Sequence, residues 1–167
     1  DLSSKDYSST LHSINAMAMA LNFAFHMHSQ PEESKLLGLC GLLHDVGKTK
    51  IKGDILTAPR KLTSYEFEEM RKHTIYGYNI LNDCKFGKRE IADCALDHHE
   101  KIDGSGYPNG KTRISRMSQI IGMIDCYEAL INDDRPYRNS MKAYEALSII
   151  IMKDVNSGKF DKKLYTQ

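Results

Sequence analysis

Seven ionisable side chains lie on, or at the ends of, segments whose apolar residues follow helical spacing. They are five histidines and two aspartates: His12, His44, His73, His98, His99, Asp45 and Asp125. The segment around Asp125 reads IIGMIDCY, and an ionised carboxylate is costly in such surroundings unless a partner offsets its charge. The fold must therefore supply partners for these groups, which limits the folds open to the chain.

Apolar residues recur at helical spacing along most of the chain, and no stretch alternates between apolar and polar residues with a period of two. This pattern predicts an all-α domain of about six or seven helices. We expect helices at residues 7–28, 31–45, 63–81, 89–99, 114–132 and 140–156, a loop at 49–62 and a Gly-rich loop at 103–111. The first helix should bury a stripe formed by Leu11, Ile14, Met17 or Ala18, Leu21 and Phe25, with His12 beside it.

The heptapeptide LLHDVGK, residues 42–48, places an imidazole, a carboxylate and an ammonium in quick succession at the end of the second expected helix. Gly47 is expected to adopt a left-handed conformation just past the helix end, with His44 and Asp45 in the last turn. The carbonyl groups at a helix end favour a bound cation, whereas Lys48 could meet an anionic substrate. The heptapeptide therefore indicates a metal site beside a phosphate site.

The chain of 167 residues is long enough for one buried core, so we expect a single domain spanning residues 1–167. No apolar run approaches the roughly 20 residues that a membrane-spanning helix needs. A net charge of +1 offers no strong field for holding a nucleic-acid polymer. Four cysteines without a C-x-x-C pair or a signal-peptide pattern indicate a cytoplasmic protein. Because the chain opens without Met, we expect a fragment of a longer protein with an upstream regulatory domain.

The seven ionisable groups together favour metal binding, although each histidine alone is more often a core or surface residue. Imidazole and carboxylate ligands without thiolates suit iron, manganese, zinc or nickel. Six or seven ligands exceed what one ion can use while leaving a position for water, so two ions are expected. Because a carboxylate has two oxygens, we assign Asp45 as the bridge between the ions.

Longer motifs extend this pattern along the chain. LLHDVGK is followed by KLTSYEFEEMRKH, then by DHHEKIDGSGYP, and finally by DCYEAL and DRPYR. In order and spacing, these motifs resemble the HD-GYP subgroup of the HD-domain phosphohydrolases from Tyr7 to about Leu164. The resemblance implies an all-helical HD-type domain around a binuclear metal site. It also implies hydrolysis of cyclic di-GMP to linear pGpG, with slower onward cleavage to GMP, in bacterial second-messenger signalling.

The resemblance also implies roles for individual residues. The implied metal ligands are His44, Asp45, His73, His98, His99 and Asp125, and His12 stands where the first helix of the family carries a histidine near the metals. Whether His12 is itself a ligand is left open. Asp45 and Lys48 are the expected catalytic residues. Substrate contacts are expected from Lys48, Gly106, Tyr107, Arg135 and Arg138. Tyr107 could stack on a guanine or hydrogen-bond a phosphate, and Gly106 could let the backbone approach the substrate.

The number of ions follows from one departure from the family pattern. Members with three metals carry a Glu one helical turn before the first histidine, and Ser8 occupies that place here. A hydroxyl is a poor ligand at neutral pH, so we expect two divalent ions, iron or manganese first, with zinc or nickel as alternatives. One ion should be held mainly by His44, Asp45 and Asp125, and the other by Asp45, His73, His98 and His99.

Two alternative functions stay open at this stage. The chain could be a module of low or no activity that binds cyclic dinucleotides or a signalling partner, because loops near the substrate differ from the family pattern. It could also be an HD phosphohydrolase that acts on another cyclic dinucleotide or nucleotide. The expected partners are cyclic di-GMP as substrate, a diguanylate cyclase or another signalling protein, and a second copy of the chain in a homodimer.

Overall fold

The computed structural model describes residues 2–84, 88–131 and 142–164, and side chains at 9–84, 88–131, 142–150 and 152–164. In this part of the chain all regular structure is helical and no strand occurs, as the sequence predicts. The α-helices are α1 (Leu2–His26), α2 (Pro31–Leu43), α3 (Gly53–Leu56), α4 (Ser64–Arg71), α5 (His73–Asp83), α6 (Arg89–Asp97), α7 (Arg116–Ile131) and α8 (Ala143–Ile149). Shorter 3₁₀ turns lie at Val46–Lys50 and Lys162–Leu164, and a π-helical turn at Ile150–Val155 continues α8.

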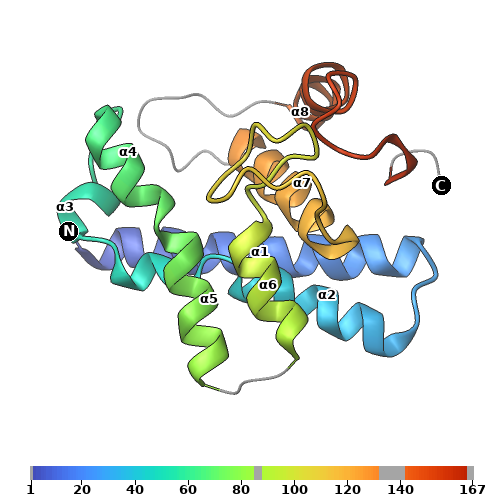
Figure 1. The fold of residues 1–167 in the computed structure, drawn as a ribbon, viewed down its shortest axis with the longest axis horizontal. Coiled ribbons are helices and arrows are strands. Elements are labelled where there is room, and N and C mark those ends of the chain that lie inside the picture. Colours follow the sequence, from blue (N-terminus) through green and yellow to red (C-terminus); the bar gives the residue numbers. More distant parts are fainter. Residues whose placement is uncertain (1, 85–87, 132–141, 165–167) are drawn as a thin grey trace.

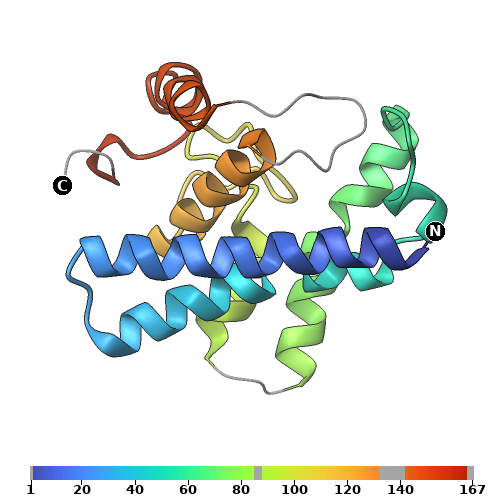
Figure 2. The same ribbon diagram turned by 180° about the vertical axis from the view of Figure 1, so that it is seen from behind.

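Five helices build the core. The longest, α1, runs along the long axis of the molecule, and α2 returns beside it (Figure 1). Helices α5 and α6 pack on each other, and α6 also contacts α2 and α7. Seen from behind, α1 lies across the other core helices (Figure 2). Five parts of these helices thereby meet at the centre of the domain. They are the C-terminal ends of α2 and α6, the start of α5, and the middle of α1 and of α7.

Small residues line the buried face of α1, so the expected stripe of large apolar residues is wrong. Ala16, Ala20 and Ala24 are fully buried, whereas Ile14, Leu21 and Phe25 are 44%, 40% and 76% exposed. On α2, Gly41 faces this row, and a Cβ added to it would lie 2.8 Å from the carbonyl oxygen of Ala16. The two helices approach too closely for large side chains. His12 is one turn before Ala16 and shares the buried face.

The helix expected over residues 63–81 is two helices. Its start is as expected, because Thr63 and Glu66 form a reciprocal capping box at the first turn of α4. The chain then tightens at Lys72, whose N–H donates to the carbonyl of Glu69, three residues earlier. A new helix, α5, begins at His73. The break places His73 at a helix start rather than in mid-helix.

Gly47 is not a left-handed helix stop, because it lies within the 3₁₀ turn Val46–Lys50 and is absent from the residues with positive φ. α2 ends at Leu43, so His44 caps this helix and Asp45 lies just beyond it. A Cβ on Gly47 would collide with the backbone of His73 and Gly77 in α5. The glycine therefore allows the turn after α2 to pack directly on α5.

Among the helices of the described residues, none combines the length and the apolarity that crossing a membrane requires.

Candidate metal centre

Three buried histidines are oriented in the same way, each by a backbone carbonyl three residues earlier. The Nδ1 atoms of His44, His73 and His98 lie 2.8, 2.7 and 2.9 Å from the carbonyl oxygens of Gly41, Met70 and Ala95, respectively. A carbonyl only accepts, so each Nδ1 carries the proton and each Nε2 keeps a lone pair. All three side chains are at most 2% exposed. The backbone thus fixes both the ring direction and the tautomer that suits metal binding.

The free Nε2 atoms converge in pairs. His12 Nε2 lies 3.2 Å from His44 Nε2, and His73 Nε2 lies 3.4 Å from His98 Nε2. Two nitrogens that bind one ion at about 2.1 Å, with an angle of about 90–110° between them, are about 3.0–3.4 Å apart. Lone pairs brought this close repel each other unless a cation lies between them. The spacing therefore fits two ligand pairs, each with its own ion.

Asp45 joins the two pairs. Its Oδ1 lies 3.3 Å from His73 Nε2, whereas its Oδ2 lies 3.4 Å from the Nε2 atoms of both His12 and His44. Oδ1 is buried and has no hydrogen-bond donor within the described residues. An unpartnered buried carboxylate oxygen is costly, and a cation bound between it and the histidines would satisfy it. The geometry suits the bridging role that the sequence predicts for Asp45.

His12 and Asp125 lie beside His44 and form the first group of potential ligands with it. Asp125, on α7, places its Oδ1 3.3 Å from His12 Nε2 and 4.0 Å from His44 Nε2. The other ring nitrogen of His12, Nδ1, donates to Glu128 Oε2 at 2.6 Å, and Asn15 also donates to this carboxylate. His12 thus turns its Nε2 toward the site, as the three carbonyl-bound histidines do. The geometry favours His12 as a ligand.

The sequence interpretation missed Glu128. It lies three residues after Asp125 on α7 and is 2% exposed although it is acidic. The available signal was its spacing, because residues three apart on a helix share a face, and the face of Asp125 was already expected to point inward.

His99 lies with His73 and His98 in the second group of potential ligands. Three groups have potential ligand atoms that all lie within 4.8 Å of one another. The groups are His73, His98 and His99; His12, His44 and Asp125; and His44, Asp45 and His98. His99 also faces Asp125, with 3.8 Å between its Nδ1 and Asp125 Oδ2. The structure therefore brings all seven sequence-predicted groups together.

The carboxylates of the site are held in the ionised form. Burial acts to raise the pKa of Asp45, but the charge of Lys48 and a hydrogen bond from His12 oppose it, and this pKa is held well below its usual range. Burial opposes ionisation of Asp125 in the same way, and the hydrogen bond from His12 is the main factor that lowers its pKa. Ionised carboxylates are the form that binds metal.

Four histidines of the site divide into two classes by the direction in which their pKa shifts. Burial lowers the pKa of His73 and of His98, and it lowers the pKa of His99 to about 3, so these rings are neutral at pH 7. Burial also disfavours the charged form of His12, but hydrogen bonds to Asp125, Asp45 and Glu128 outweigh it and raise its pKa to about 11. Three carboxylates thus make the position next to His12 strongly favourable for a positive charge, whether a proton or a metal ion.

Lys48 lies at the rim of the cluster. Its ammonium pairs with Asp45 Oδ2, and its side chain is 29% exposed, whereas that of Asp45 is only 6% exposed. The lysine therefore stands between the buried carboxylate and solvent. An anionic group that approached the cluster from this side would meet the ammonium first.

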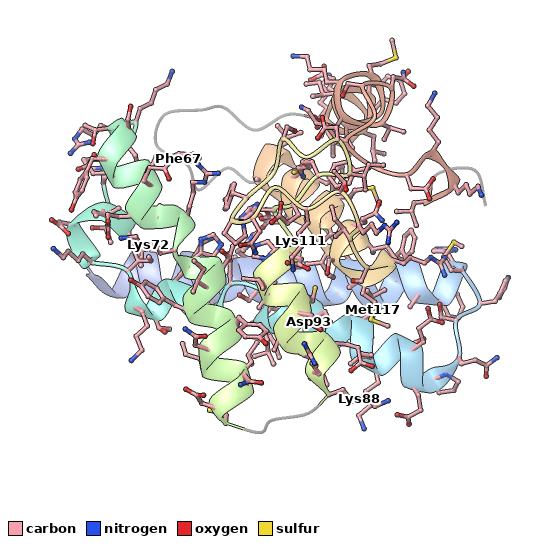
Figure 3. The ribbon with its side chains drawn as sticks, in the orientation of Figure 1. Phe67, Lys72, Lys88, Asp93, Lys111 and Met117 are labelled. Carbon is pink, nitrogen blue, oxygen red and sulfur yellow. The ribbon has the colours of Figure 1, made fainter. Side chains whose placement is uncertain are left out.

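The loop at 103–111 lies over the cluster and is anchored by Glu100. This side chain is 1% exposed, and its carboxylate accepts the backbone N–H groups of Asn109 and Lys111 at 2.7 and 2.9 Å. Figure 3 labels Lys111 at the end of this loop. A Cβ on Gly106 would collide with the backbone of Glu100, so this glycine accommodates the protein's own chain. The Tyr107 ring stacks on His99 with 4.6 Å between centroids.

The family model of the HD domain matches residues 2–164. This chain belongs to the HD-domain family. Divalent metal binding by His and Asp residues is a property of HD domains, and the clusters above provide such groups. Two expected substrate contacts of this HD domain, Arg135 and Arg138, lie outside the described residues, as does the side chain of Ser8.

Comparisons with known proteins agree with this assignment. The HD domain is 36% identical over 148 residues to a protein named cyclic di-GMP phosphodiesterase of Pseudomonas aeruginosa, covering 87% of this chain and 36% of that protein. It is 33% identical over 156 residues to 3'3'-cGAMP-specific phosphodiesterase 1 of Vibrio cholerae, and the match covers 92% of this chain and 36% of that protein. The chain therefore spans about a third of the length of these relatives. A solved HDG"Y"P protein from Bdellovibrio bacteriovorus shares the fold, with a TM-score of 0.72 and 18% identity. The match covers 93% of this chain and 49% of that protein.

Proposed function

We propose that this HD domain is a metal-dependent phosphodiesterase that hydrolyses cyclic di-GMP to linear pGpG with two divalent ions, iron or manganese. The main support is that the two oxygens of Asp45 face two separate groups of histidines. Oδ1 lies 3.3 Å from His73 Nε2, and Oδ2 lies 3.4 Å from His44 Nε2. His12, His44 and Asp125 would hold one ion, and His73, His98 and His99 the other. Ions bound in such a pair act as Lewis acids and activate water for in-line attack on phosphorus.

The residues around the cluster have separate tasks in this reaction. Lys48, paired with Asp45 at the rim, would bind a non-bridging phosphate oxygen and stabilise the negative charge that develops there. The Tyr107 loop would cover the cluster and limit access of bulk water. Water adds across one P–O3' bond, leaving a 5'-phosphate on one nucleotide and a 3'-hydroxyl on the other. The product is therefore linear, with one phosphodiester still intact.

The names of relatives support a cyclic dinucleotide as substrate and favour a second candidate. The 36%-identical relative is named for cyclic di-GMP, and a 33%-identical relative is named for 3'3'-cGAMP. A mixed GMP–AMP cyclic dinucleotide is therefore the alternative substrate. A module that only binds its ligand is less well supported, because it would not need a complete set of buried metal ligands.

The test is hydrolysis by purified protein that has been loaded anaerobically with Fe(II) or Mn(II). We expect cyclic di-GMP to be cleaved, pGpG to accumulate in the time course, and Asp45→Ala to abolish turnover. A parallel series with 3'3'-cGAMP would rank the two substrates. A metal-replete wild type that cleaves neither would refute the proposal, and tight binding of cyclic di-GMP without product would favour the binding module.

We further propose that the protein acts in the cytoplasm, and the four free cysteines, Cys40, Cys84, Cys94 and Cys126, are compatible with a reducing compartment. The upstream regulatory domain, a signalling protein partner and a homodimer stay predictions.

A further inference from the structure

Four planar groups form a continuous row that begins in the metal centre and ends at the surface. The row runs from His99 to the Tyr107 ring, 4.6 Å away between centroids. The guanidinium of Arg71 lies 4.5 Å from the centroid of Tyr107 and 5.9 Å from that of Phe67. Phe67 itself meets Tyr107 edge-on, with 6.4 Å between centroids. The row therefore links a candidate metal ligand to an aromatic residue on α4.

The exposure of these groups changes along the row. Tyr107 is partly buried and already has His99 and Arg71 against its ring. Phe67, at the outer end of the row, is 47% exposed, and Figure 3 labels it on α4. A single exposed apolar residue is ordinary on a protein surface. The position of Phe67 is informative because it continues a stack that starts at the reaction centre.

We propose that Phe67 and Arg71 form a stacking subsite for one purine base of the cyclic dinucleotide. This inference rests on the proposed function, since it places the base when the phosphodiester lies at the metal centre. Two ring-to-ring steps, 4.6 and 6.4 Å, separate His99 from Phe67, so only the Tyr107 ring lies between this candidate ligand and the subsite. Arg71 also pairs with Glu68, with 2.7 Å between Nη1 and Oε1, and this ion pair is compatible with the position of its guanidinium beside the ring.

The chemistry of the subsite favours a purine over other groups. Stacking on an aromatic side chain depends on the π-face of the base, and the larger purine offers more of it. A guanidinium beside the stack adds a cation–π interaction. Loss of one base–aromatic stack typically weakens binding by roughly 5- to 150-fold. We therefore expect Phe67→Ala to raise the KM for cyclic di-GMP by about 10-fold with little change in kcat.

Tryptophan fluorescence tests the subsite directly, because the chain contains no Trp. Phe67→Trp keeps an aromatic ring and introduces a unique reporter. The matched control is Tyr65→Trp on the same helix, because Tyr65 is 71% exposed and forms no ring contact with Tyr107 among the described residues. The probe is the phosphorothioate analogue of cyclic di-GMP, which resists hydrolysis, added to the metal-loaded protein. The cyclic di-UMP analogue serves as the pyrimidine comparison.

We expect the guanine ligand to quench Trp emission in the Phe67→Trp variant, the uracil ligand to quench it less, and neither to affect the Tyr65→Trp variant. Calorimetry on the same samples reports binding independently of fluorescence. Calorimetric binding to Phe67→Trp without quenching, together with an unchanged KM in Phe67→Ala, would overturn the subsite and leave the proposed function intact. Absence of calorimetric binding and turnover in the wild type would instead refute the proposed function, and the subsite with it.

Discussion

The inner and outer parts of the site are built differently. Inside, His44, His73 and His98 are almost fully buried, and each ring is fixed by a carbonyl of the backbone. At the rim, Lys48 and Phe67 are partly exposed and are held by other side chains. Ligands fixed by the backbone cannot move without moving a helix, whereas rim residues can change without disturbing the fold. Under the proposed function, the inner part would therefore set which reaction is catalysed, and the rim would set which phosphodiester is accepted.

If the inner part depends on close helix packing, the largest effect should come from a change that replaces no ligand. In Gly47→Ala the new Cβ would collide with the backbone of His73 and Gly77. Backbone cannot yield as a side chain can, so we expect a loss of about 3 kcal/mol in unfolding free energy and roughly 10 °C in Tm. Thermal unfolding followed by circular dichroism measures both.

The matched control is Gly53→Ala, because a Cβ at Gly53 meets nothing within 4 Å. We expect this variant to stay within about 0.5 kcal/mol of the wild type. Equal stability of the two alanine variants would show that the contact between the Val46–Lys50 turn and α5 does not position the ligands.

A smaller effect is expected from the carboxylate behind His12. Glu128→Gln keeps the size of the side chain but removes the charge that accepts from His12 Nδ1. Loss of such a partner behind a metal-binding histidine typically lowers metal affinity by 10- to 100-fold. Competition with a chelator measures this affinity, and Glu90→Gln, at an exposed acidic residue on α6, is the control. Unchanged affinity in Glu128→Gln would mean that His12 does not bind metal.

The rim should respond differently from the metal cluster. Glu100→Gln replaces one of the two oxygens that accept the N–H groups of Asn109 and Lys111, which loosens the loop that carries Tyr107. An unsatisfied buried donor costs about 1–3 kcal/mol, so kcat/KM should fall about 10-fold while the metal content stays the same. Steady-state kinetics measures kcat/KM, and elemental analysis measures the metal content. Glu32→Gln, at an exposed position, is the control. Loss of metal in Glu100→Gln would contradict the division into two parts.

The metal centre was largely predictable because its residues stand out against apolar helices. A histidine or aspartate at the end of an apolar run, as at His44 or Asp125, is costly without a partner, and this holds whatever the exact packing is. The all-helical fold was predictable for a similar reason, since helical spacing survives small errors in the boundaries. The assignment of this chain to the HD-domain family confirms the motif resemblance at the level of the family.

Features that depend on contacts between helices were not predictable from periodicity. The row Ala16, Ala20 and Ala24 is buried because α2 approaches closely at Gly41, and the larger neighbouring residues suggested a different face. Gly47 was expected to stop a helix, but it instead allows close contact with the backbone of His73, 26 residues further along the chain. Phe67 and Arg71 belong to the motif KLTSYEFEEMRKH, but nothing in the sequence indicates that α4 faces Tyr107.

The central claim is that Asp45 bridges two ions in one site, and metal stoichiometry tests it most directly. Elemental analysis of protein purified anaerobically with excess Fe(II) or Mn(II), then freed of unbound metal, should give two ions per chain. Ser8 provides no carboxylate for a third. His12→Ala should lower the value toward one, because His12 lies beside the group that contains His44 and Asp125. One ion in the wild type would contradict the bridge, and three would contradict the argument from Ser8.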